Sequence, residues 1–173
     1  MVKTSWKAYF RIAFDSISRS KSGMKRPPAL YFLFFFHLFL SFNALIAGGL
    51  MILEPQGSLL QITPAYLSKS PFESFLFPGI ILFMFNGLFP LFTFCGLLFK
   101  PNWHWADALN LYSDKHWGWS YSLYSGIILI IWITIQITLT PYYWLQPLFI
   151  GIGLLIIIFT MLSGSIRYFS IPK

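Results

Sequence analysis

Charged side chains are scarce in this chain. Only 10% of its 173 residues are charged and five are acidic, whereas 57% are hydrophobic and 21% are aromatic. Soluble domains have about a quarter of their residues charged, so this composition excludes an ordinary water-soluble globule. The scarcity is greatest in four long apolar stretches, which contain no acidic or basic residue except His37.

The chain also has few of the residues that reactive chemistry needs. Cys95 is its single cysteine, so an intrachain disulfide and a dithiol redox pair are excluded, and we expect a buried, inert thiol. The sequence contains no Gly-x-Ser-x-Gly, no His-Glu-x-x-His and no glycine-rich loop before a lysine. We therefore expect a protein that is not an enzyme and uses no cofactor.

The four apolar stretches are the main feature that is present. They cover residues 29–53, 75–99, 121–139 and 145–166. A helix rises about 1.5 Å per residue, so about 20 residues cross a hydrocarbon core of about 30 Å. The stretches lack the period-two alternation of barrel strands. They predict an all-α integral membrane protein whose four transmembrane helices form an antiparallel bundle.

The basic residues predict how the chain crosses the membrane. Eleven of the twelve lie before the first stretch, between the second and third, or after the fourth, and Lys69 is the exception. By the positive-inside rule, both termini are cytoplasmic, and residues 54–74 and 140–144 face outward. The net charge of +7 then reflects topology rather than nucleic-acid binding. The first stretch is too long for a signal-peptide core, so we expect a retained anchor.

Residues 1–26 are predicted to form a separate unit, a cytoplasmic amphipathic helix on the membrane surface, and residues 27–173 form the transmembrane domain. Apolar and basic side chains recur with helical spacing on opposite faces of this unit. The basic face would meet anionic lipid head groups, and docking of a cytoplasmic partner is the alternative. The predicted membrane-surface residues are Trp6, Lys7, Phe10, Arg11, Phe14 and Ile17.

Polar side chains inside the apolar stretches are candidates for function. The main ones are His37, Ser41, Asn43, Asn86 and Gln136. A polar group in hydrocarbon costs free energy unless it is hydrogen-bonded or faces a cavity. Interhelical hydrogen bonds that fix packing explain them most simply. The alternative is a small oligomeric channel lined by Asn43 or Asn86, which needs no charge in the membrane.

Aromatic residues at both ends of the stretches predict interfacial belts, because amphipathic rings favour the membrane surface. The belt residues are Trp103, Trp105, Trp117, Trp119, Tyr142, Tyr143 and Trp144. The loop at 101–120 also contains four candidate metal ligands, His104, Asp107, Asp114 and His116. Imidazole with carboxylate suits zinc, manganese or iron, which makes a metal-dependent membrane enzyme another alternative. The spacing matches no strong ligand motif, so we expect no bound metal.

The segment between the first two stretches is too apolar for a free loop, and we expect it to fold as a short cap over the helix ends. Its last part, Ser70-Pro71-Phe72-Glu73, has the pattern of a capping box and predicts that the second helix begins after Ser70. Pro78 would then lie beyond the first turn and would kink this helix.

Four short motifs stand out along the chain: Glu54 to Leu59, Ser70 to Gly79, Trp132 to Gln136 and Trp144 to Pro147. As a set they resemble the motifs of a widespread group of small bacterial four-span membrane proteins of uncharacterised function. The resemblance implies a bacterial inner membrane. Taken together, the sequence predicts a non-enzymatic interaction or structural component that contacts the lipid bilayer and associates with a second copy of itself or with another membrane protein.

Overall fold

The computed structural model describes residues 25–171. Every named element in this range is a helix, and the only β-type pairing there is an isolated bridge between Lys115 and Ser170. The all-α prediction is therefore confirmed. The six predicted membrane-surface residues all lie within 1–24, outside the described residues.

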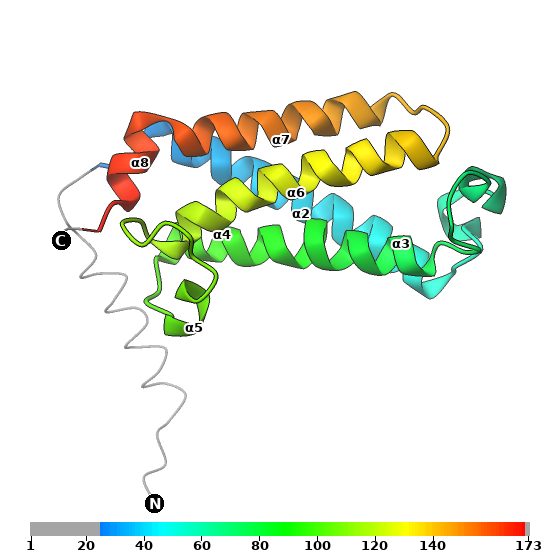
Figure 1. Ribbon diagram of the computed structural model, residues 1–173, viewed down its shortest axis with the longest axis horizontal. Coiled ribbons are helices and arrows are strands. Elements are labelled where there is room, and N and C mark those ends of the chain that lie inside the picture. The colour runs from blue at the N-terminus through cyan, green and yellow to red at the C-terminus, as the bar shows by residue number, and fades with distance from the viewer. Residues whose placement is uncertain (1–24, 172–173) are drawn as a thin grey trace, which may run out of the picture.

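The long helical segments lie side by side, as Figure 1 shows. They are α2 (Pro28–Leu53), α3 (Leu76–Ile81) continuing through η3 (Leu82–Leu88) into α4 (Phe89–Phe99), α6 (Trp117–Leu139) and α7 (Leu145–Met161). The short elements are η1 (Ser58–Leu60), η2 (Pro64–Leu67), α5 (His104–Asp107) and α8 (Ser163–Phe169). Three segments are long and apolar enough to cross a membrane, and α7 with α8 gives a fourth when the two count as one bent span. This arrangement is compatible with a multi-pass membrane protein.

Small residues let the helices approach closely in two helix pairs. A Cβ added to Gly126 on α6 would lie 2.8 Å from the Gly153 carbonyl oxygen on α7. A Cβ added to Gly48 on α2 would lie 2.9 Å from the Gly79 carbonyl oxygen on α3. Backbone therefore packs against backbone in both helix pairs. Gly151 differs, since a Cβ there would meet nothing within 4 Å.

The two ends of this helical body are built differently. At one end, here called the α8 end, the first turns of α2 and α6 meet the end of α4 and the short helix α8 (Figure 1). Hydrogen bonds tie this end together, from Lys100 Nζ to the Tyr168 oxygen at 2.7 Å and from the His116 amide to the Phe169 oxygen at 2.9 Å. At the other end, the α3 end, residues 54–75 fold over the helix termini through η1 and η2, as a cap.

The fourth predicted span, 145–166, is broken near its end. Helix α7 stops at Met161, and α8 continues from Ser163 at an angle of 61°. Leu162 between them is extended, and the Ser163-Gly164 pair that follows has low helix propensity. Ser165 Oγ stabilises the break because it donates to the Phe159 oxygen at 2.8 Å. With 17 residues, α7 alone rises only about 26 Å.

The second and third helices also begin elsewhere than predicted. The expected capping box at Ser70 is wrong, because Ser70 Oγ instead accepts from the Phe72 amide in a local turn at 3.2 Å, and α3 starts at Leu76. Pro78 therefore lies in the first turn, where its missing N–H has no cost. The third helix starts at Trp117 rather than at residue 121.

The irregular part of the second segment lies at η3, which is a π-helix. Pro90 has no N–H to offer the Asn86 oxygen four residues earlier, and its ring would clash with that oxygen in an α-helix. The backbone widens there, as shown by the Phe89 amide donating to the Met84 oxygen five residues before it. Such π-turns inside α-helices are frequent at functional sites.

Candidate functional site

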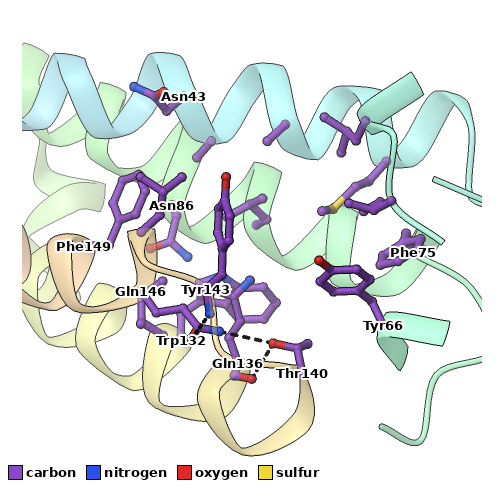
Figure 2. Close-up of a pocket in the computed structure, with 18 of the residues that line it drawn as sticks. Asn43, Tyr66, Phe75, Asn86, Trp132, Gln136, Thr140, Tyr143, Gln146 and Phe149 are labelled. Carbon is purple, nitrogen blue, oxygen red and sulfur yellow. Dashed lines mark hydrogen bonds between the residues drawn. The ribbon is translucent and has the colours of Figure 1, made fainter. Parts of the chain in front are cut away.

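A cavity of about 590 Å³ lies at the α3 end. Its walls come from α2 and η3 on one side and from α6, α7 and their connecting turn on the other, with residues 60–62 of the cap over it (Figure 2). The space exists because α6 packs extensively against α4 but only slightly against η3, so the helix pairs diverge toward this end. Most of the lining is aliphatic or aromatic.

Asn86 is the most unusual side chain in this cavity. It is 1% exposed, and neither Nδ2 nor Oδ1 of its amide has a hydrogen-bond partner among residues 25–171. Trp132 on α6 also lines the cavity, and within the same range its buried indole Nε1 has no acceptor. Figure 2 shows both side chains projecting into the cavity from different helices. Two donor nitrogens, Asn86 Nδ2 and Trp132 Nε1, and one acceptor oxygen, Asn86 Oδ1, are thus unpaired among the described residues of the lining.

Two other polar side chains of the lining, Gln146 and Thr140, are paired. Gln146 Oε1 accepts from the Tyr143 amide at 3.0 Å, and Gln146 Nε2 donates to Thr140 Oγ1 at 3.2 Å. Thr140 Oγ1 in turn donates to the Gln136 backbone oxygen at 2.8 Å. These bonds, drawn in Figure 2, fix the turn between α6 and α7. The Asn86 amide and the Trp132 indole are the fully buried polar groups of the lining that have no partner among residues 25–171.

The cavity is uncharged and reaches the surface. None of the described residues that line it is acidic, basic or a histidine. Asn43, Tyr66 and Tyr143 are lining residues with exposed side chains. The cap near the cavity is held by the Glu54 carboxylate, which accepts from Ser58 Oγ at 2.8 Å. That hydrogen bond lowers the pKa of Glu54 below its ordinary value.

No family model, curated protein or solved structure matches this chain.

The predicted intramembrane polar residues separate into two groups. Asn43, Asn86 and Gln136 line the cavity, although Asn43 Nδ2 donates to its own helix at the Phe39 oxygen, 2.7 Å away. Ser41 and His37 have packing roles instead. Ser41 Oγ donates to the Gly87 oxygen at 2.8 Å, which joins α2 to η3. His37 is fully buried, and its Nδ1 bonds the Leu33 oxygen at 2.7 Å, whereas its Nε2 has no partner among residues 25–171 and lies away from the cavity lining.

The four tryptophans predicted to form a belt at the α8 end differ in exposure. Trp117 and Trp119 are 0% and 4% exposed, so their rings lie in the core rather than at a surface. Their indoles donate to the oxygens of Pro101 and Thr160, each at 2.8 Å, because α6 begins early and carries both rings into the core. Trp103 and Trp105 are exposed and stack on Phe92. The belt residues at the α3 end, Tyr142, Tyr143 and Trp144, are exposed.

The four candidate metal ligands do not form a site in the described part of the chain. No group of three or more His, Cys, Asp or Glu side chains between residues 25 and 171 could hold a metal ion. His104 and Asp107 are exposed on α5, and Asp114 pairs with Lys115. Both ring nitrogens of His116 are hydrogen-bonded.

His116 caps helix α6. Its Nδ1 accepts from the Gly118 amide at 3.1 Å, and its Nε2 donates to the Pro101 oxygen at 3.2 Å. This bonding requires a neutral ring, and burial lowers the pKa of His116 below its ordinary value. The residue therefore has a structural role as an N-cap.

Sequence reasoning missed Trp132, Tyr66 and Tyr143 as parts of the cavity. Trp132 reads as one more apolar residue in a spanning stretch, and its indole N–H was not counted among the polar groups of the membrane. Counting that donor would have made Trp132 a candidate, since a buried indole usually finds an acceptor. The tyrosines carried no such signal, because exposed tyrosines near helix ends are common in membrane proteins.

Proposed function

We propose that this chain is a non-enzymatic, multi-pass protein of a bacterial inner membrane, folded as an antiparallel four-helix bundle, which holds a small, mainly apolar molecule in the cavity at its α3 end. The sequence predicts an interaction role, and in this proposal the interaction is the binding of this molecule. The observation that carries the proposal is the buried Asn86 amide, which has no partner in residues 25–171.

The cost of that amide supports binding. A buried polar group without a hydrogen bond costs about 1–3 kcal/mol, and a leucine of similar size would avoid the cost. The amide is explained if a bound molecule supplies the missing partners. The cavity volume of about 590 Å³ lies within the range of about 300–1,000 Å³ that is usual for small-molecule sites.

The distribution of basic residues supports the orientation within this proposal. Arg26, Lys100, Lys115 and Arg167 all flank helix termini at the α8 end, whereas Lys69 lies in the cap at the α3 end. By the positive-inside rule, the α8 end and both termini are cytoplasmic, and the cavity lies toward the opposite side of the membrane. In this orientation, the basic side chains at the α8 end contact anionic lipid head groups of the inner leaflet.

The two alternative functions fit the geometry less well. A channel between copies would need Asn86 or Asn43 on a surface shared by several chains, but Asn86 is 1% exposed within one chain. Asn43 is exposed, yet its amide bonds its own helix. A metal-dependent enzyme would need His116, both of whose ring nitrogens are used in capping. Association with a second copy or with another membrane protein is compatible with the binding role.

Native mass spectrometry tests the proposal. The full chain would be extracted from bacterial membranes in lipid nanodiscs, and we expect a population that carries one bound small molecule. Ala47 lines the cavity, so Ala47→Trp should fill it and remove that population. Gly151→Trp is the control, because a side chain there starts in open space. Equal occupancy in the wild type and Ala47→Trp would overturn the proposed function.

A further inference from the structure

The geometry points to the chemical class of the bound molecule. We infer that it is an uncharged compound with an apolar body and one group that both donates and accepts hydrogen bonds, namely a hydroxyl or a carboxamide. This inference rests on the proposed function, since it takes the cavity as a binding site. It is carried by the unpaired groups of Asn86 and Trp132 and by the character of the other walls.

The walls exclude a charged head group. The lining contributed by residues 25–171 has no lysine, arginine, aspartate, glutamate or histidine. An ion moved from water into such surroundings loses its hydration and gains no opposite charge, which costs far more than a hydrogen bond returns. Carboxylates, phosphates and ammonium groups are therefore disfavoured, and so are the head groups of ordinary phospholipids.

The hydrogen-bonding groups select between uncharged ligands. Asn86 offers one unpaired acceptor, Oδ1, and unpaired N–H donors on Nδ2, and Trp132 offers one further donor. An ether, ester or ketone accepts only, so it would leave Oδ1 without a partner. A hydroxyl or carboxamide donates to Oδ1 and also accepts from Nδ2 or from the indole, which satisfies both kinds of group.

The remaining walls require an apolar body. Leu40, Leu129, Ile133 and Phe149 line the cavity with aliphatic and aromatic surface, and they favour hydrocarbon by about 25 cal/mol for each Å² buried. Asn43 is an exposed lining residue part-way along α2, at a level flanked by exposed apolar side chains such as Phe42. A ligand can thus enter from the hydrocarbon region of the bilayer.

Two sources share this chemistry, linear lipid alcohols and phenols with an alkyl chain. Four probes of equal chain length separate them from each other and from the excluded classes: dodecanol, para-dodecylphenol, dodecyl methyl ether and dodecanoate. Binding of each to the full chain in nanodiscs would be measured by equilibrium dialysis. We expect dodecanol, the phenol or both to bind about tenfold more tightly than the ether, because one further hydrogen bond is made. Dodecanoate should bind more weakly still.

Variants tie this preference to the named residues. Asn86→Leu should reduce binding of the preferred probe to the level of the ether, and Trp132→Phe should weaken it by a smaller factor. Thr134→Val is the control and should keep the preference, because Thr134 is exposed on α6 and bonds its own helix at Ile130. The wild-type ranking of probes decides the inference even if Asn86→Leu does not fold.

The outcomes separate this inference from the proposed function. If the ether binds as tightly as the alcohol and the phenol, and Ala47→Trp abolishes binding of all probes, the inference is overturned while the binding function stands. If dodecanoate binds most tightly, the inference is also overturned. If no probe binds and native mass spectrometry gives equal occupancy for the wild type and Ala47→Trp, both proposals are overturned.

Discussion

Trp119 and Trp132 lie on the same helix, α6, at opposite ends of the molecule, and their indoles meet different surroundings. At the α8 end, Trp119 Nε1 donates to the Thr160 oxygen at 2.8 Å, and the side chain is part of a filled core. At the α3 end, Trp132 Nε1 is buried without an acceptor in residues 25–171 and lines a cavity. Burial of a polar ring therefore does not mark a candidate site; burial without a partner in the wall of a cavity does.

The packing at the two ends of the molecule differs in the same way. At the α8 end, Phe92 stacks on Trp117 with ring centroids 4.9 Å apart, and a Cβ on Gly96 would lie 2.4 Å from that indole. At the α3 end, diverging helices leave about 590 Å³ of space. The α8 end is thus densely packed and the α3 end encloses the cavity proposed to bind a ligand, and four predictions test this division.

The largest effect is expected at the α8 end. Trp117→Ala should lower the free energy of unfolding by about 3–5 kcal/mol, because it empties a fully buried site and leaves the Pro101 oxygen with one donor fewer. Unfolding in mixed micelles titrated with sodium dodecyl sulfate would measure it. Trp105→Ala is the matched control and should cost about 1 kcal/mol or less, since Trp105 is 64% exposed. Equal losses would contradict the division.

A change of opposite sign is expected at the α3 end. Asn86→Leu should raise the free energy of unfolding of the ligand-free protein by about 1–3 kcal/mol, because it removes an unpaired buried amide. The comparison variant is Ser41→Ala, which removes a hydroxyl that is bonded to Gly87 and should lose about 0.6 kcal/mol. A loss of stability in ligand-free Asn86→Leu would show that the amide is satisfied within the protein.

The His116 cap predicts a pH dependence of stability. Burial lowers the pKa of His116 in the folded state below its unfolded value of 6.5, so the unfolded chain binds more protons between the two values. The free energy of unfolding should fall as the pH is lowered from about 6.5 through the folded-state pKa, and level off below it. His116→Asn keeps a capping acceptor without titrating and should reduce this dependence. A variant with the same pH profile as the wild type would assign the effect to another group.

The smallest effect concerns a hydrogen bond between helices. Ser122 Oγ lies 2.7 Å from Thr160 Oγ1, which joins α6 to α7 near the α8 end. A double-mutant cycle with Ser122→Ala and Thr160→Val should give a coupling of about 0.6 kcal/mol. A reference cycle combines Ser122→Ala with Thr134→Val, because Thr134 is exposed. In that cycle the two changes in the free energy of unfolding should add. Equal coupling energies in the two cycles would show that the coupling does not come from the hydrogen bond between Ser122 and Thr160.

Much of the fold was predictable because lipid imposes simple lengths and compositions on a chain. The apolar stretches at 29–53 and 75–99 agree with the helical limits within one residue. The break at Leu162 was not predictable, since Ser163 and Gly164 differ little from small residues that pack inside a straight helix. The start of α6 was placed four residues late, because Trp117 to Ser120 reads as interfacial when hydropathy is considered alone.

Individual residues of the candidate site were predictable from the sequence, but their arrangement around one cavity was not. Asn86 was identified as an intramembrane polar group from its type and position, and so were Asn43 and Gln136. Periodicity within one helix could not show that these side chains and Trp132 share a cavity, because that depends on how two helix pairs diverge. It also could not separate Asn86, which is unpaired in residues 25–171, from Ser41, which is bonded to the neighbouring segment.

The π-helix η3 makes the number of residues between α3 and α4 as important as their identity. A π-turn holds one residue more than an α-turn, so deleting one residue from Leu82–Leu88 would convert the wide turn into an α-turn. The ring of Pro90 would then be forced against the carbonyl oxygen four residues before it. Substitution is therefore better tolerated in this segment than any change in its length.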